Sequence, residues 1–356
     1  MAKTTFEPDY NIPPGATLKE ALEDRGLTQS DLCLRTGLAE KTVSQIINGI
    51  APISYETAEK LEFATGIPAT FWNQRELTYR QAIIRQVETS KLAANKEWLK
   101  EIPTKELIER DLLVSTKDKG DLVRQSLGFF GVSSVESWRK TWLNPQVQFR
   151  GKKSHDKHPG FVAAWLRIGE LKAQLIDCEP FDAGEFRRSI KKAVSITLAP
   201  ASDWPQKLRD ICAPAGVAVV FVKEIPSAGV SGVTKWVTKD KAVIQVSLKF
   251  KTDDQLWFSF FHEAGHVLLH SKKQIFIEYG RSTESKEEEE ANEFARNLLI
   301  PPEHSPRLHL LKRKSEIRQF AKSIGVSPGI VVGRLQHEGF LPRSYFNDLK
   351  RKLVWG

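Results

Sequence analysis

Apolar residues recur at helical spacing over much of the chain, and strand-like patterns are confined to a short stretch past its middle. Near the N-terminus, residues 27–49 predict two short helices joined at Gly37, a residue that suits a turn needing positive φ. A first helix is expected over residues 17–25, with Thr17 as its N-cap. The spacing of apolar residues predicts a shared core formed by Leu32, Leu38, Val43, Ile46 and Ile47.

Residues 215–222 and 242–247 predict strands, because they are rich in β-branched residues and are bounded by Gly, Pro and charged residues. Residues 256–269 are mostly apolar and predict a buried helix. A further helix is expected over residues 287–299, where the helical period stops before Pro301. The pattern as a whole predicts an α+β fold that is predominantly helical.

The buried helix carries His262, Glu263 and His266, which form an H-E-x-x-H pattern. Positions four apart lie one above the other on a helix, so both imidazoles can direct a ring nitrogen at one divalent ion. Zinc peptidases combine two such ligands with a neighbouring carboxylate as general base. The alternative is two histidines spaced by accident, but a buried histidine needs a partner and a metal would supply one. His270 lies about 12 Å further along a straight helix than His262 and is expected to support a ligand or to pack.

The next helix is the expected source of a third ligand. Its projection puts Glu287 and Glu288 at the edges of the apolar face, and periodicity alone does not separate the two. Glu289 and Glu290 lie outside that apolar face and are expected to form a solvated acidic face. Asn292 lies one turn after Glu288, where its amide could orient a ligating group.

The net charge of +9 is distributed unevenly along the chain. Residues 1–76 contain 7 Lys and Arg against 11 Asp and Glu, whereas residues 301–356 contain 11 against 4. Attraction to phosphate supplies most non-specific DNA affinity, so an acidic N-terminal region predicts weak DNA binding by a single copy. Either a homodimer or the basic remainder of the chain must add to that affinity.

The 3 cysteines form no C-x-x-C pair, which suits a reducing cytoplasm and excludes a cysteine-ligated zinc site. The N-terminus shows no basic-then-apolar leader, and no apolar run approaches the roughly 18 residues of a membrane span. We therefore expect a cytoplasmic protein that is neither secreted nor inserted in a membrane.

The runs HEAGHVLLH and ESKEEEEANEFARNLLIP resemble the ImmA/IrrE family of zinc metallo-endopeptidases. The resemblance implies a zincin-like domain with a small β-sheet, whose edge beside the zinc helix could bind an extended peptide. It also implies a Zn2+ ion held by His262, His266 and Glu288, with Asn292 in an outer position. Glu263 would then take a proton from the attacking water and later deliver it to the leaving amine.

Residues 17–72 resemble the Cro/cI-type (XRE) helix-turn-helix, particularly the HigA-like antitoxin form, which implies a five-helix domain. The second helix of the motif, residues 40–47, would be the recognition helix in the major groove of DNA. The polar residues implied to face the groove are Glu40, Lys41, Thr42, Ser44 and Gln45. Gln29, before this helix, and Asn48, after it, would contact the DNA backbone or support the recognition helix.

We expect four parts: a helix-turn-helix domain over residues 1–76, a helical middle region over 77–205, a peptidase core over 206–305, and a basic helical C-terminal region over 306–356 packed on the peptidase. The two resemblances together imply a DNA-binding regulator that hydrolyses a peptide bond of a partner repressor or antitoxin to control transcription. The alternative is an antitoxin-type regulator whose peptidase-like domain only senses or docks a partner. Glu263 favours catalysis, because a purely structural zinc site has no need of a base.

Overall fold

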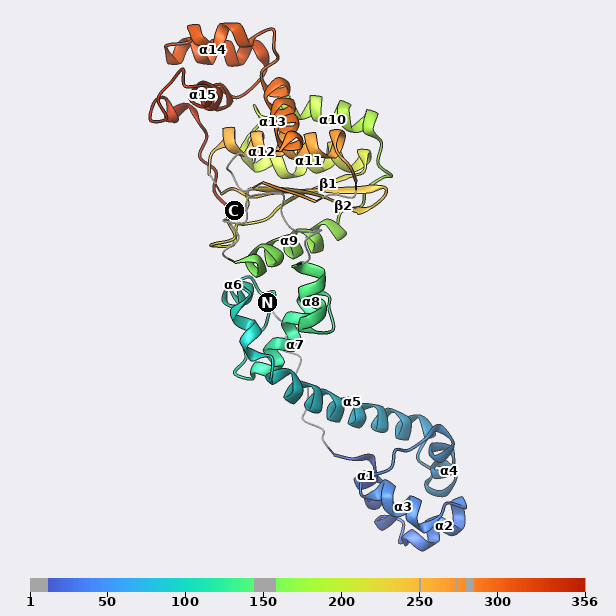
Figure 1. Ribbon diagram of the computed structural model, residues 1–356. Helices are drawn as coiled ribbons and strands as arrows, with labels where there is room; N and C mark the ends of the chain where they lie inside the picture. The colour runs from blue at the N-terminus through green and yellow to red at the C-terminus, as the bar shows by residue number, and fades with distance from the viewer. Residues whose placement is uncertain (1–11, 144–157, 250, 273–274, 279–284, 356) are drawn as a thin grey trace. The chain divides into compact units, whose positions relative to one another are not determined.

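The structure is a computed structural model that describes residues 12–143, 158–249, 251–272, 275–278 and 285–355 (Figure 1). The described residues form two compact units. The N-terminal unit comprises the chain up to Lys96 together with Thr116–Arg124, and the C-terminal unit comprises Glu97–Ser115 and the chain from Gln125 onward. The protein is α+β and mostly helical, as the sequence predicts.

The N-terminal unit has the predicted helix-turn-helix arrangement. Its helices are α1 (Pro14–Glu23), α2 (Gln29–Thr36), α3 (Glu40–Ile47), α4 (Tyr55–Thr65) and α5 (Ala69–Ala93). α2 begins with a capping box between Thr28 and Asp31 and ends at Gly37, whose φ of 68° confirms the expected left-handed turn. The predicted core is also confirmed, because Leu32, Val43 and Ile46 are buried and Leu38 and Ile47 pack against them.

The predicted start of the first helix was wrong. α1 begins at Pro14, so Thr17 lies inside the helix and caps nothing. Proline at the first helical position has no amide hydrogen to leave unpaired, and its fixed φ already suits the helix. The Thr17 hydroxyl instead accepts a hydrogen bond from Arg75 Nη2 of α5, at 3.2 Å.

The expected division at residues 76, 205 and 305 stays a prediction. Residue 76 lies within α5, which continues as one helix to Ala93. Of the expected middle region, residues 77–96 and Thr116–Arg124 belong to the N-terminal unit. Its other described residues belong to the C-terminal unit.

The C-terminal unit is built from helices on both faces of a small sheet. The helices that follow α5 in the chain are α6 (Thr104–Glu109), α7 (Lys119–Phe130), α8 (Val135–Trp142), α9 (Pro159–Gln174), α10 (Ala183–Ile196), α11 (Trp204–Cys212), α12 (Asp253–Leu269), α13 (Lys286–Leu299), α14 (Lys314–Ile324) and α15 (Pro328–His337). Short 3-10 turns are η1 (Lys96–Lys100), η2 (Ala201–Asp203), η3 (Ala213–Ala215), η4 (Ser305–Leu310) and η5 (Asn347–Leu349).

The described strands are β1 (Val217–Phe221), β2 (Gly232–Thr238), β3 (Lys241–Val246) and β4 (Phe276–Glu278), in the spatial order β1-β3-β2-β4. β3 runs parallel to β1 and antiparallel to β2, and β4 is antiparallel to β2. The strands predicted over 215–222 and 242–247 are confirmed as β1 and β3. β4 was not predicted, because three residues are too few to show an alternating pattern.

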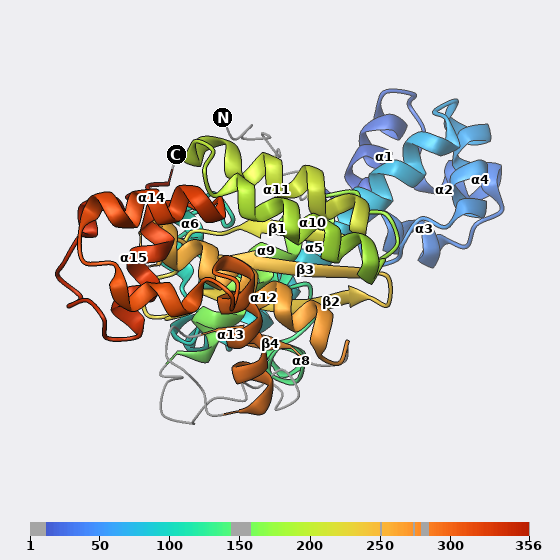
Figure 2. The ribbon, with the colours of Figure 1, turned by 90° about the horizontal axis from the view of Figure 1, so that it is seen from above.

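α9 covers one face of the sheet, and α10 to α13 lie over the other (Figures 1 and 2). Along β3, Ile244 and Val246 belong to the core that contains Trp257 and Phe260 of α12. Gln245 points to the opposite face, where its amide nitrogen donates to the Trp165 carbonyl of α9 at 2.8 Å. Because both faces are covered, β3 is apolar almost throughout instead of alternating.

The C-terminal residues pack against the beginning of α12. Ser327 Oγ donates to Asp253 Oδ2 at 2.6 Å, and the Arg351 amide donates to Asp253 Oδ1 at 2.9 Å. Lys350 Nζ lies 2.7 Å from Asp254 Oδ2. Two buried carboxylates in the first turn of α12 thus anchor the tail of the chain, at the helix end where negative charge is favoured.

Candidate metal centre

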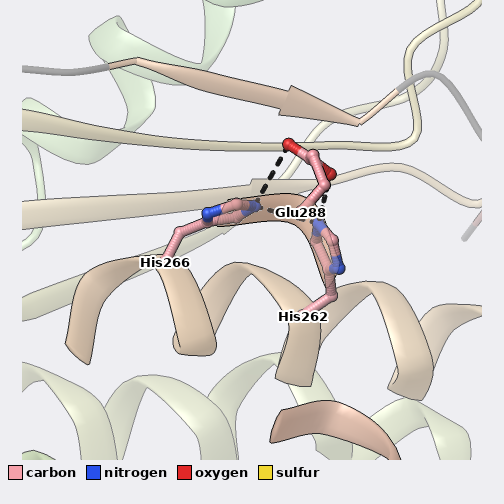
Figure 3. Close-up of side chains that lie close together, drawn as sticks. All are labelled: His262, His266 and Glu288. Atoms are coloured by element: carbon pink, nitrogen blue, oxygen red, sulfur yellow. Dashed lines mark hydrogen bonds and ion pairs between the residues drawn. The ribbon is translucent and has the colours of Figure 1, made fainter. Parts of the chain in front are cut away.

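α12 positions the H-E-x-x-H residues inside the C-terminal unit. It is buried along nearly its whole length, so His262 and His266 are only 2% and 1% exposed. Their side chains rise from one face of the helix, one turn apart, and their Nε2 atoms lie 3.0 Å from each other (Figure 3). The four-residue spacing therefore brings both imidazoles to one point.

α13 brings the third group to this point. Ser285 caps the helix by accepting from the Glu288 amide, and the buried Ala291 packs close to Gly265 of α12. Small residues at this crossing let the two helices approach closely. The Glu288 carboxylate then lies 3.2 Å from His262 Nε2 and 3.5 Å from His266 Nε2.

These three residues fit a zinc ion. Ligand atoms of His262, His266 and Glu288 lie within 4.8 Å of one another, and they form the metal-binding group found among the described residues. Around a tetrahedral zinc with bonds of about 2.0 Å, neighbouring ligand atoms are about 3.3 Å apart. The Nε2 atoms of the two histidines are 3.0 Å apart and His262 Nε2 lies 3.2 Å from Glu288 Oε2, both close to that value. His266 Nε2 lies 3.5 Å from the other carboxylate oxygen, Oε1. Of the two glutamates that periodicity leaves open, Glu288 is the one in the cluster.

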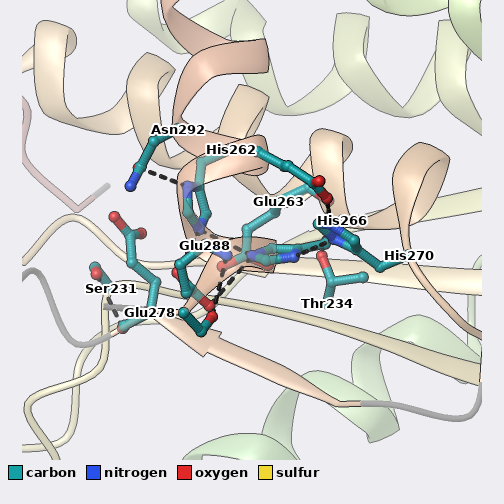
Figure 4. A network of polar contacts seen from close by, with 11 residues as sticks. Ser231, Thr234, His262, Glu263, His266, His270, Glu278, Glu288 and Asn292 are labelled. Carbon is teal, nitrogen blue, oxygen red and sulfur yellow. Dashed lines mark hydrogen bonds and ion pairs between the residues drawn. The ribbon is translucent and has the colours of Figure 1, made fainter. Parts of the chain in front are cut away.

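A second set of side chains contacts the cluster from outside (Figure 4). Asn292 Oδ1 lies 3.0 Å from His262 Nδ1. His270 Nδ1 lies 2.9 Å from His266 Nδ1, and its Nε2 lies 3.1 Å from Glu290 Oε2. Glu290 thus lies on the exposed side of α13, with its side chain 42% exposed, and also contacts His270. α12 ends at Leu269, so His270 no longer follows the helical spacing of His262 and His266. It turns towards α13 and contacts Glu290, which a helical projection does not indicate.

Glu263 lies beside the cluster and is fully buried. Its backbone carbonyl accepts from Thr234 Oγ1 of β2 at 2.9 Å, but its two carboxylate oxygens have no hydrogen-bond partner among the described residues. The carboxylate lies against Gly232, where a Cβ would be 2.5 Å from Glu263 Oε1. Burial raises the pKa of Glu263 well above its usual range. Such an unpaired buried carboxylate fits a site that holds a positive ion.

β4 supplies two residues that the sequence did not indicate. The Phe276 ring stacks on His266 with centroids 4.0 Å apart, and Glu278 has a buried carboxylate oxygen without a hydrogen-bond partner among the described residues. Burial alone would lower the pKa of His262, but the carboxylates of Glu288, Glu278 and Glu263 outweigh it and raise this pKa to about 9. Burial and the neighbouring imidazoles lower the pKa of His266 to about 2. Three carboxylates, those of Glu263, Glu278 and Glu288, thus face the imidazole pair.

Comparison with known families agrees with this geometry. Residues 216–336 match the IrrE N-terminal-like domain, which belongs to a family of zinc metallopeptidases. Residues 18–72 match the helix-turn-helix family. The chain thus combines a helix-turn-helix domain with an IrrE N-terminal-like domain. A search of curated proteins finds no match to it.

A pocket of about 390 Å³ lies next to the cluster in the IrrE-like domain. The end of the pocket next to the cluster is lined by His262, Glu278 and Glu288. The pocket continues along α12 past Phe258. Its far wall is formed by α15, through residues that include Arg334. The C-terminal region therefore contributes to the surface beside the candidate metal centre as well as packing on the domain.

The helix-turn-helix domain presents the residues expected to contact DNA. Gln29, Glu40, Lys41, Ser44 and Asn48 are exposed, and Thr42 and Gln45 are partly buried. The Asn48 side chain donates to the Ser44 carbonyl at 2.8 Å, so it also closes the end of α3. The buried Val43 and Ile46 hold the opposite face of α3 against the core. Among the described residues of the whole protein, no helix is long and apolar enough to cross a membrane.

Proposed function

We propose that this protein is a DNA-binding regulator with zinc-dependent endopeptidase activity, which hydrolyses a peptide bond of a partner repressor or antitoxin. The observation that carries the proposal is the cluster of His262, His266 and Glu288 with the unpaired carboxylate of Glu263 beside it. A structural site would need the three ligands and a fourth, but no neighbouring base.

The residues take distinct roles in this proposal. His262, His266 and Glu288 hold the ion, and Asn292 orients the His262 ring through its Nδ1. Zinc, when bound, supplies a Lewis acid that polarises the peptide carbonyl and the attacking water. Glu263 accepts a proton from that water and donates it to the leaving amine. Its position against Gly232 keeps the carboxylate beside the imidazole pair.

The surroundings of the cluster suit an extended peptide. β4 hydrogen-bonds to β2 on one side and is the last of the described strands in the sheet. A peptide added along its other side would complete a further strand, with main-chain hydrogen bonds giving affinity. The pocket beside His262 would take side chains of this peptide, with Phe258 offering an apolar contact.

The helix-turn-helix domain brings this activity to DNA. α3 enters the major groove and presents Lys41 and Gln45 to base edges, while Gln29 contacts the backbone. Because residues 1–76 carry more acidic than basic residues, a homodimer bound to two half-sites supplies the affinity that one copy lacks.

The test compares newly formed protein N-termini in cells that make the wild-type chain or the Glu263→Gln variant. We expect one partner protein to be cut by the wild type alone, and purified wild-type protein to repeat the cut until a chelator is added. Removal of one acid/base group costs roughly 10²- to 10⁴-fold in rate, whereas Glu263→Gln should still hold one zinc per chain. Cleavage by Glu263→Gln at the wild-type rate contradicts the role of Glu263. A zinc-loaded chain that cuts nothing supports the alternative of a non-catalytic sensing or docking domain.

A further inference from the structure

The two imidazoles of the metal cluster are supported by different partners (Figure 4). His262 Nδ1 meets a single amide, Asn292, at 3.0 Å. His266 Nδ1 lies 2.9 Å from Nδ1 of a second imidazole, His270, whose Nε2 lies 3.1 Å from Glu290 Oε2. His266 is therefore connected through His270 to a carboxylate that is 42% exposed on the surface of α13.

The direction of these hydrogen bonds follows from the role of His266 as a ligand. A ligating His266 offers the lone pair of Nε2, so its proton is on Nδ1 and is donated to His270. His270 must then accept at Nδ1 and carry its own proton on Nε2, where the Glu290 carboxylate accepts it. Each of the two hydrogen bonds then contains one proton. The Glu290 carboxylate thus fixes the tautomer of His270, and His270 in turn fixes the tautomer of His266.

Packing holds both rings of this pair in place. Phe276 of β4 stacks on His266, with an interplanar angle of 13°, and its ring centroid lies 5.1 Å from that of His270. The His270 side chain is only 5% exposed. Its extended backbone, with φ −118° and ψ 171°, takes it out of α12 and towards α13. Rotation of either ring would lose both an aromatic contact and a partly buried hydrogen bond.

We propose that His270 and Glu290 form a positioning relay for the metal ligand His266. The relay fixes the tautomer of His266, orients its ring and strengthens its bond to zinc. The Asn292 amide has the corresponding role for His262. This inference rests on the proposed zinc site, and it identifies the groups outside the ligand set that determine how tightly and in what geometry the ion is held.

The test measures the affinity of the full chain for Zn2+ by competition with a chromophoric chelator, and the geometry of the site from the visible absorption of bound Co2+. The variants are Glu290→Gln, His270→Ala and His270→Asn. Asparagine places an acceptor oxygen close to the position of the imidazole Nδ1 but has no contact with Glu290. The matched control is Glu289→Gln, because the neighbouring Glu289 pairs with Arg296 and lies outside the relay. Thermal unfolding of the metal-free variants verifies that each is folded.

Loss of a group that supports a ligand lowers metal affinity by roughly 10- to 100-fold. We expect Glu290→Gln to lower zinc affinity about 10-fold. His270→Ala should lower zinc affinity by nearly 100-fold and shift the Co2+ spectrum. Glu289→Gln should match the wild type in both measurements. His270→Asn should equal Glu290→Gln, and combining the two should add no further loss, because each removes the charged Glu290 carboxylate from the hydrogen-bonded chain that ends at His266.

Equal zinc affinity and an unchanged Co2+ spectrum in the His270→Ala variant would overturn the relay and leave the proposed function standing. Additive losses in the double variant would also overturn it, since they show two independent contacts. A wild-type chain that binds no zinc contradicts the proposed function and the relay together.

Discussion

Gly232 of β2 lies directly against the carboxylate of Glu263 of α12: a Cβ on Gly232 would be 2.5 Å from Glu263 Oε1 and 3.0 Å from its Cγ. The absence of a side chain at Gly232 of β2 thus leaves room for the Glu263 side chain of α12. Since Glu263 is fully buried and its carboxylate has no hydrogen-bond partner among the described residues, this contact is a main determinant of where the carboxylate lies.

The first prediction concerns this contact. Gly232→Ala displaces the Glu263 carboxylate without touching a ligand of the cluster. Zinc should bind with nearly wild-type affinity, while peptide hydrolysis falls by at least about 100-fold, because a misplaced base is almost equivalent to a missing one. Overpacking should also cost about 1–3 kcal/mol of unfolding free energy.

The matched control is Gly128→Ala in α7, where a Cβ would meet no atom within 4 Å. Its zinc content and cleavage rate should stay at wild-type values, and its stability should not fall. Measurement of bound zinc and of the cleavage rate on the same preparations separates a loss of zinc from a displacement of the Glu263 carboxylate. Hydrolysis by Gly232→Ala at the wild-type rate would falsify the role given to this glycine.

The second prediction separates two adjacent glutamates. Glu288→Ala removes a carboxylate that lies 3.2 Å from His262 Nε2, so zinc affinity should fall by more than roughly 100-fold. Glu287→Ala, one residue earlier on α13, should leave zinc affinity within about threefold of the wild type. Isothermal titration or chelator competition measures both. The assignment of Glu288 is wrong if the two variants exchange these results.

The third prediction concerns metal removal. Zinc that binds the folded IrrE-like domain stabilises it by about 2.7 kcal/mol when free zinc is 100 times the dissociation constant. Chelation should therefore lower the unfolding temperature of the C-terminal unit and leave that of the N-terminal unit unchanged. Calorimetry of the full chain shows both transitions. In the His262→Ala variant the chelator should have no effect, and an equal shift in this variant would mean that zinc binds elsewhere.

The fourth prediction tests the recognition helix. Lys41→Ala and Gln45→Ala each remove an exposed or partly buried polar group of α3, and each should cost about 1–3 kcal/mol of specific binding. The measurement is a band-shift titration on the promoter of the protein's own gene. Lys91→Ala is the control, because Lys91 lies in the last turn of the long helix α5. Unchanged binding by both α3 variants would remove the assignment of this helix.

Much of the candidate site was predictable because it depends on local spacing. His262, Glu263 and His266 are close in sequence, and helical geometry alone puts the two imidazoles on one face. The helix-turn-helix was predictable for the same reason, since Gly37 and the apolar positions around it act within a short segment.

Periodicity could not choose between Glu287 and Glu288, because both lie at the edge of the apolar face of α13 and the choice depends on how α13 crosses α12. It also gave no sign of the contact between Glu290 and His270, since nothing in the sequence shows that His270 leaves the helix and approaches α13. Phe276 and Glu278 were missed because β4 pairs with a strand some 40 residues earlier in the chain.

The sequence by itself determined the elements and the paired imidazoles, because hydrogen bonding and side-chain direction within one helix repeat over a few residues. The tertiary structure decided which carboxylate joins them, which groups support each ring and which glycine leaves room for the base. Those contacts join segments that are distant in the sequence, and they depend on the packing of whole helices and strands against one another.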